Sequence, residues 1–337
     1  MTNKVVKNTV ANIVSKVWAV ISLYLFVPIW ISYVGVDGYG IIAFYTVLMV
    51  LLHFADAGLS AMLTREFARE DRNEEYKSDL LYTTERFYYI IAFFLFVFLF
   101  VFSEWIVDFF LKSPNIPKQD LIYDMRLMSV IVAFNFLYML YNGGLIGKQM
   151  MVLSNAISIS YSFSRSVIVI VFLYFWPSVE TFLYWQLVSI IVTLFIARYS
   201  LIHSMNINSE CHYRLDYVKN QLGFSLGMMM MAIISALNSQ MDKLVTGHVL
   251  SLESLGYYSL ASSIGSAVLI MVQPLGSAFY PELTRRLSSK DSNYKDFFLI
   301  FTYIVSMLSS IVGFLLLFNI NDITYLWTHD WNIVNRV

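Results

Sequence analysis

The chain has 337 residues, of which 58% are hydrophobic and only 13% are charged, and its 22 Lys and Arg nearly balance its 23 Asp and Glu. Soluble domains carry about 25% charged residues, so this composition excludes an ordinary soluble protein and indicates a membrane protein. The single cysteine, Cys211, excludes an intramolecular disulfide and a cysteine-built metal site.

Nine apolar segments are long enough to cross a bilayer, which takes about 20 residues of helix. They cover residues 6–34, 39–63, 86–111, 121–146, 152–176, 179–203, 220–247, 254–283 and 295–320. The sequence therefore predicts an all-α polytopic membrane protein with about nine transmembrane helices. The connection at 64–85 mixes acidic and basic residues, and we expect it to be a solvated helix or loop.

The positive charges at the ends of these segments and between them lie mostly on one side of the predicted membrane. Fifteen Lys and Arg belong to the N-terminus and the even-numbered connections, whereas the other side holds only Lys112, Lys118 and Arg336. Positive charge accumulates on the cytoplasmic side of membrane proteins. We therefore predict a multi-pass protein whose N-terminus is cytoplasmic.

An internal repeat links the two ends of the chain. Gly38-Tyr39 recurs as Gly256-Tyr257, Gly58 recurs as Gly276, and Leu63-Thr64-Arg65 recurs as Leu283-Thr284-Arg285. Because the start of one copy is six predicted helices away from the start of the other, both copies keep the same orientation in the membrane. We expect residues 1–219 to form a six-helix bundle and residues 220–337 an incomplete second bundle of three helices, related to the first by a pseudo-twofold axis. Repeated bundles around a midplane site are typical of transporters.

Polar side chains recur three or four residues apart on five of the predicted helices, so each set shares one helix face. The sets are Asn8, Asn12 and Lys16; His53, Asp56 and Ser60; Asn135, Tyr138 and Asn142; Asn155, Ser158, Ser162 and Arg165; and Ser235, Asn238 and Asp242, with Lys243 beside them. One such stripe could join two helices by hydrogen bonds. Five stripes are better explained as the walls of one polar cavity, and the cost of a charge in hydrocarbon predicts that Lys16 and Arg165 face it.

Several of these residues keep more than one interpretation. Asp242 and Lys243 could pair locally, and Asp56 could be either the buried partner of a cation or a protonatable coupling site. Pro274 and Gly276 are predicted to let the eighth helix bend. The sequence has neither a glycine-rich phosphate loop nor a positioned acid–base or metal cluster, which argues against an enzyme or an ATP-driven pump. We expect no cofactor and no nucleic-acid partner, and transport coupled to an ion or proton gradient.

A set of loose motifs runs along the whole chain: Lys7–Asn12, Tyr33–Gly40, Phe54–Leu59 followed by Thr64-Arg65, Asn238–Lys243, Leu255–Ala261, Pro274 and Tyr280–Thr284. With these motifs the chain resembles the lipid-linked oligosaccharide flippases, the polysaccharide-transporter branch of the multidrug/oligosaccharidyl-lipid/polysaccharide exporter superfamily. The resemblance implies an inner-membrane protein that flips undecaprenyl-pyrophosphate-linked units of O-antigen (lipopolysaccharide), capsule or exopolysaccharide by alternating access. Because the family has twelve or more helices, it also implies a second bundle that is truncated at its C-terminal end.

The resemblance assigns roles to the polar stripes. Lys16, Arg165 and Lys243 would attract the diphosphate, Asn12, Asn135, Asn142, Asn155 and Asn238 would line the cavity and contact sugar hydroxyls, and Asp56 and Asp242 would be coupling candidates. The implied partners are the lipid-linked oligosaccharide, membrane lipids, and the polysaccharide polymerase with its chain-length machinery. Two alternatives stay open: a multidrug or small-cation exporter of the same superfamily, with an acidic lumen at Asp56 and Asp242, and an inactive truncated membrane protein.

Overall fold

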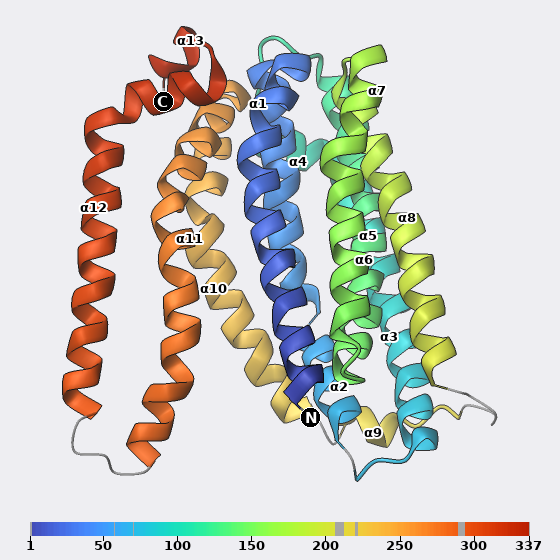
Figure 1. Cartoon of the computed structure of the whole chain (residues 1–337). Coiled ribbons are helices and arrows are strands. Elements are labelled where there is room, and N and C mark those ends of the chain that lie inside the picture. The colour runs from blue at the N-terminus through green and yellow to red at the C-terminus, as the bar shows by residue number, and fades with distance from the viewer. Residues whose placement is uncertain are drawn as a thin grey trace. The chain divides into compact units, whose positions relative to one another are not determined.

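The computed structural model describes residues 2–56, 58–69, 71–205, 212–219, 222–288 and 294–336, and these residues form helices without any strand (Figure 1). The elements are α1 (Thr2–Ala55), α2 (Leu59–Ala68), α3 (Glu74–Val101), α4 (Ser103–Phe110), α5 (Lys118–Gly147), α6 (Met151–Phe163), the π-helix η1 (Ser164–Ile168), α7 (Val169–Phe175), α8 (Val179–Ser204), α9 (Leu215–Lys219), α10 (Leu222–Val249), α11 (Leu252–Ser288), α12 (Tyr294–Thr328) and α13 (Trp331–Val334).

Six helical spans within the described residues are long and apolar enough to cross a membrane. They are Tyr24–Leu52, Glu74–Val101, Lys118–Gly147, Met151–Phe175, Val179–Ser204 and Tyr294–Thr328. Large apolar side chains such as Phe94 and Phe318 are 65% and 82% exposed, and exposed apolar surface of this kind marks contact with lipid or another apolar partner. The predicted all-α polytopic membrane protein is thus confirmed. The other expected segments correspond to the first part of α1, to α10 and to α11.

Two of the expected segments belong to a single kinked helix. The segments 6–34 and 39–63 both begin in α1, where only Gly35 leaves the helical conformation, with φ 72° and ψ 176°. Glycine adopts a positive φ at little cost because it has no Cβ. The connection expected over Gly35–Gly38 therefore reduces to a kink at one residue, and a second glycine, Gly58 (φ 71°), provides the break between α1 and α2.

Helix α5 lies at the centre of the first part of the chain, where it packs against α8, α3 and α2. Glycines in its last turns make this packing close. A methyl group at Gly144 would lie 2.5 Å from Leu201 of α8, and one at Gly147 would lie 2.7 Å from the carbonyl oxygen of Thr64 in α2. Helices in membranes associate through such close packing of small residues, since lipid supplies no hydrophobic driving force between them.

The described residues pack as two compact units, residues 1–256 and residues 257–337. In the first unit α1, α5, α6, α7 and α8 run alongside one another, and α10 also packs against α1 (Figure 1). In the second unit Phe279 of α11 stacks on Phe301 of α12, with ring centroids 3.6 Å apart. Tyr325 of α12 stacks on Trp331 of α13 at 4.5 Å. The expected bundles of residues 1–219 and 220–337, related by rotation, stay a prediction.

The starts of the two repeat copies touch each other within the first unit. A methyl group at Gly256 would lie 2.7 Å from the carbonyl oxygen of Val36 and 3.4 Å from the backbone nitrogen of Gly40. A methyl group at Gly40 would overlap the carbonyl group of Leu252. We call the contact among Val36, Gly40, Leu252 and Gly256 the glycine junction. It joins the α10–α11 corner to α1 by backbone contacts that leave no space for a side chain.

The charged segment 64–85 is not uniformly solvated. Glu66 is fully buried and pairs with Arg69 and Arg72, whose guanidinium nitrogens lie 3.6 Å and 3.5 Å from its carboxylate. In the loop between α2 and α3 the Arg69 guanidinium donates to Asp71 and lowers the pKa of that carboxyl to about 2. The prediction of a solvated segment is wrong for Glu66, because a carboxylate can be buried when cations are held beside it.

Candidate functional site

Arg165 lies in the middle of a membrane span, in the π-helical turn η1. A π-turn leaves backbone carbonyl groups without their usual helical partners, and such turns are frequent at functional sites. Two side chains of α8 donate to these carbonyl groups: the Trp185 indole N–H to Ser164 at 2.8 Å, and the Gln186 amide to Arg165 at 3.1 Å. The irregular turn that presents Arg165 is therefore held in place from the neighbouring helix.

Aromatic hydroxyl groups surround the Arg165 side chain. Its guanidinium carbon lies 5.6 Å from the ring centroid of Tyr161, within the range of a cation–π contact. Tyr161 in turn donates to the side-chain oxygen of Asn135 at 3.2 Å. Tyr45 of α1, whose hydroxyl is buried, interacts electrostatically with both Tyr161 and Arg165.

No carboxylate in the described part of the chain forms an ion pair with Arg165; the groups acting on it are Tyr161 and Tyr45. An arginine at this depth ordinarily pairs with an acidic residue or lines a wet cavity. Among the described residues, the positive charge of this site is thus accompanied by neutral tyrosines, an arrangement suited to an anionic ligand.

The predicted stripe of α5 faces α6 and is joined to it by three hydrogen-bonded pairs, of whose α6 members only Ser158 belongs to the stripe predicted for that helix. These are Tyr161 with Asn135 (3.2 Å), Tyr138 with Ser158 (3.0 Å) and Ser154 with Asn142 (2.6 Å). Asn155 donates to the carbonyl group of Met151 in its own helix. These bonds join two helices, as polar side chains in membranes often do. The sugar contacts expected of Asn135, Asn142 and Asn155 stay predictions.

Asp56 is buried at the break between α1 and α2, with 5% of its surface exposed. One carboxylate oxygen accepts from the Ser60 hydroxyl at 2.8 Å, and the other accepts from the Ser60 backbone N–H and from the Tyr88 hydroxyl of α3. No basic side chain in the described part of the chain forms an ion pair with it. Both interpretations of Asp56 that the sequence left open, the partner of a cation and a protonatable coupling site, therefore stay predictions.

Helix α10 carries the predicted stripe of Asn238, Asp242 and Lys243. Asn238 and Asp242 are exposed and Lys243 is half-buried, and the carboxylate of Asp242 acts on the Lys243 ammonium beside it. The local pairing of these two side chains, which the sequence left open, stays a prediction. The proposed substrate role of Lys243 and the coupling role of Asp242 are still predictions.

Four predicted site residues have side chains outside the described part of the structure. Lys16 and Asn12 lie in α1, and Pro274 and Gly276 lie in α11. The same holds for His53. The cationic cavity formed jointly by Lys16 and Arg165, and the bend at Pro274 and Gly276, are therefore predictions without a structural test.

The structure adds residues that the sequence did not single out. Tyr161 stands four residues before Arg165, so helical spacing alone could have paired them. Tyr45 and Tyr88 reach Arg165 and Asp56 from other helices. Nothing in the local sequence announces these two contacts, because they depend on how the helices pack.

We expect Tyr88→Phe to lower the free energy of unfolding by about 1–3 kcal/mol, because the buried Asp56 carboxylate loses a donor that water cannot replace. Thermal unfolding of the purified protein, followed by circular dichroism, measures the change. Tyr174→Phe is the matched control, since Tyr174 is 69% exposed. Equal melting temperatures for Tyr88→Phe and the wild type would show that the Asp56 contact does not stabilise the fold.

Comparisons with known proteins agree with a membrane transporter fold. The family described as polysaccharide biosynthesis protein matches residues 5–287. A Shigella flexneri protein that carries the name of an O-antigen transporter is 22% identical over 269 residues, which cover 78% of this chain. The chain spans 60% of the length of that curated relative. The solved structure of a MOP superfamily transporter from Pyrococcus furiosus covers 98% of this chain and 73% of its own, with a TM-score of 0.52 and 15% identity. At this identity the likeness shows the fold alone.

Proposed function

Because the chain belongs to the polysaccharide biosynthesis protein family, we propose that it moves lipid-linked oligosaccharides across a bacterial inner membrane by alternating access. The substrate class is an undecaprenyl-pyrophosphate-linked repeat unit of a surface polysaccharide. The name of the Shigella relative supports O-antigen as one such polysaccharide. In this proposal the N-terminus is cytoplasmic, and the polysaccharide polymerase with its chain-length machinery takes the product on the outer side.

The observation that carries the proposal is the charge of Arg165 at mid-span, which forms no ion pair with a carboxylate among the described residues. A cation in the hydrocarbon region costs about 2.5–3.5 kcal/mol on insertion scales, so it is retained where a ligand or a wet cavity compensates it. The diphosphate of the proposed substrate supplies the opposite charge. A guanidinium group also matches phosphate oxygens with two parallel N–H donors, which a lysine cannot do. The adjoining amides and hydroxyls of α5 and α6 would then meet the sugars.

Asp56 is our candidate for coupling transport to a proton gradient. Its carboxylate is buried, and no cation among the described residues pairs with it. Protonation would weaken the hydrogen bonds that it accepts from Tyr88 and Ser60, and so loosen the contact between α2 and α3. The same bonds disfavour the alternative of a small-cation exporter, because both carboxylate oxygens already accept hydrogen bonds.

The decisive experiment deletes the gene and follows both ends of the proposed reaction. We expect the deletion strain to lose surface polysaccharide and to accumulate lipid-linked oligosaccharide on the cytoplasmic leaflet, and the wild-type gene to reverse both changes. Sensitivity to cationic drugs is measured in the same strains. Unchanged polysaccharide together with increased drug sensitivity would reject the flippase and favour the exporter.

A further inference from the structure

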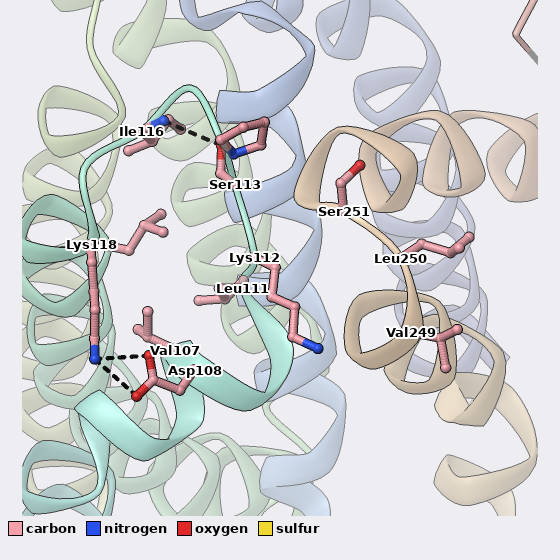
Figure 2. A pocket seen from close by; sticks show the side chains of 12 residues that line it. Val107, Asp108, Leu111, Lys112, Ser113, Ile116, Lys118, Val249, Leu250 and Ser251 are labelled. Atoms are coloured by element: carbon pink, nitrogen blue, oxygen red, sulfur yellow. Dashed lines mark hydrogen bonds and ion pairs between the residues drawn. The ribbon is translucent and has the colours of Figure 1, made fainter.

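A cavity of about 530 Å³ lies where α4 ends, α5 begins, and α10 gives way to α11 (Figure 2). Its floor is apolar and buried, formed by Val107, Leu111 and Leu121. Val249 and Leu250 line the side that belongs to α10 and the corner after it. The membrane span of α5 begins here, and α10 ends beside it, so we place the cavity near the level where the apolar slab meets the lipid head groups.

Two lysines line this cavity, and their charges are used differently. The Lys118 ammonium is 2.9 Å from carboxylate oxygens of both Glu104 and Asp108, so its charge is fully compensated. Lys112 instead extends towards α10, where its ammonium donates to the backbone carbonyl of His248 at 3.1 Å (Figure 2). In the described part of the chain no carboxylate pairs with Lys112. The cavity therefore carries one positive charge that a neutral carbonyl holds in position.

The backbone fixes Lys112 against the α10–α11 corner. The N–H of Leu252 donates to the Lys112 carbonyl oxygen at 2.7 Å. On the preceding turn, the imidazole of His248 stacks on Phe109 with ring centroids 3.8 Å apart. The ammonium thus has a defined place at the rim, with two of its three N–H donors left for a ligand.

An apolar stripe leads along α10 to the same cavity. Met241, Val245 and Val249 are four residues apart and so share one helix face, and they are 51%, 54% and 65% exposed. Val249 itself lines the cavity. On α4 the exposed Trp105 stacks on Phe109, and aromatic side chains of this kind gather at membrane–water interfaces. A positive charge at the top of an apolar track matches one kind of molecule, an anion with a hydrocarbon tail.

We propose that this cavity binds the head group of an anionic phospholipid, with the phosphate on Lys112 and an acyl chain along Met241, Val245 and Val249. Lysine attracts anionic lipid at a membrane surface. The exposed stripe on α10 offers an apolar surface along which the acyl chain can lie. A lipid seated here would touch both α4 and the α10–α11 corner. The site is separate from Arg165, so it stands whether or not the proposed transport activity is correct.

The test uses the full chain in phosphatidylcholine vesicles that contain a photoactivatable phosphatidylglycerol, with the crosslinked peptides mapped by mass spectrometry. We expect crosslinks in residues 107–121 and 241–251. Lys112→Gln is expected to reduce them about fivefold, the factor that corresponds to about 1 kcal/mol for one lysine at an anionic lipid surface. Lys219→Gln, which removes an exposed lysine of α9, is the matched control and should leave them unchanged.

Two further labelling experiments distinguish a bound anionic lipid from a bound free phosphate. A photoactivatable phosphatidylcholine should label these peptides less than phosphatidylglycerol and should not respond to Lys112→Gln. Millimolar inorganic phosphate should not displace the phosphatidylglycerol probe, because it cannot use the α10 stripe, whereas Val245→Asn should weaken labelling by both lipids. Unchanged labelling in Lys112→Gln, or complete displacement by inorganic phosphate, would overturn the lipid site.

Discussion

Replacing Arg165 by glutamine is expected to reduce surface polysaccharide about ten- to a hundredfold, because hydrogen bonds to charged groups contribute about 1.5–3 kcal/mol and each 1.4 kcal/mol changes affinity about tenfold. Glutamine preserves a polar, hydrogen-bonding side chain, although a shorter one, and removes the charge that the diphosphate would meet. The readout is polymer on the cell surface of a deletion strain that carries the variant gene, normalised to the amount of protein in the membrane.

Two companion substitutions identify the cause of the loss. Arg165→Lys keeps the charge but lacks the planar pair of donors, so we expect an intermediate level of polymer. Arg126→Gln makes the same chemical change in another membrane span, where the guanidinium of Arg126 lies over the ring of Phe100 and donates to the Ser103 hydroxyl, and it should leave the polymer near the wild-type level. Normal polymer from Arg165→Gln at normal protein abundance would remove Arg165 from the substrate site.

Replacing Gly40 by alanine should lower the free energy of unfolding by about 1–3 kcal/mol, the usual cost of forcing an extra methyl group into a filled space. The new methyl group would overlap the carbonyl group of Leu252, which belongs to the backbone and cannot rotate away. Gly256→Ala should act in the same direction, because its methyl group would lie 2.7 Å from the Val36 carbonyl oxygen. Thermal melting of the purified variants, followed by circular dichroism, gives the size of the effect.

A third glycine supplies the control for this series. A methyl group at Gly265 of α11 would meet no atom within 4 Å. Exchange of a helical glycine for alanine in an open position stabilises a helix by about 0.5–1 kcal/mol, since alanine has less conformational freedom to lose. Gly265→Ala is therefore expected to melt at the wild-type temperature or slightly above it. If Gly40→Ala also melts there, the glycine junction is looser than the structure indicates.

The sequence by itself determined the properties that depend on a single helix and the bilayer around it. The bilayer thickness fixes how many apolar residues a span needs, so the spans could be placed from composition alone. Helical spacing likewise put Asn135, Tyr138 and Asn142 on one face. The depth of Arg165 in its span also follows from residue number. The motifs that indicated the family are short stretches of consecutive residues, so they too could be recognised without the structure, and the family match agrees with them.

Only the tertiary structure decided which groups meet. That Asn135 accepts from Tyr161, that Tyr88 reaches Asp56, and that the starts of both repeat copies touch all depend on how separate helices pack. The segment 64–85 shows the same limit, because its charges predicted solvation while Glu66 is buried between two arginines. The periodicity of a helix fixes the direction of a side chain relative to its neighbours in sequence, but the partner on the facing helix is chosen by packing across long sequence separations, which no local pattern records.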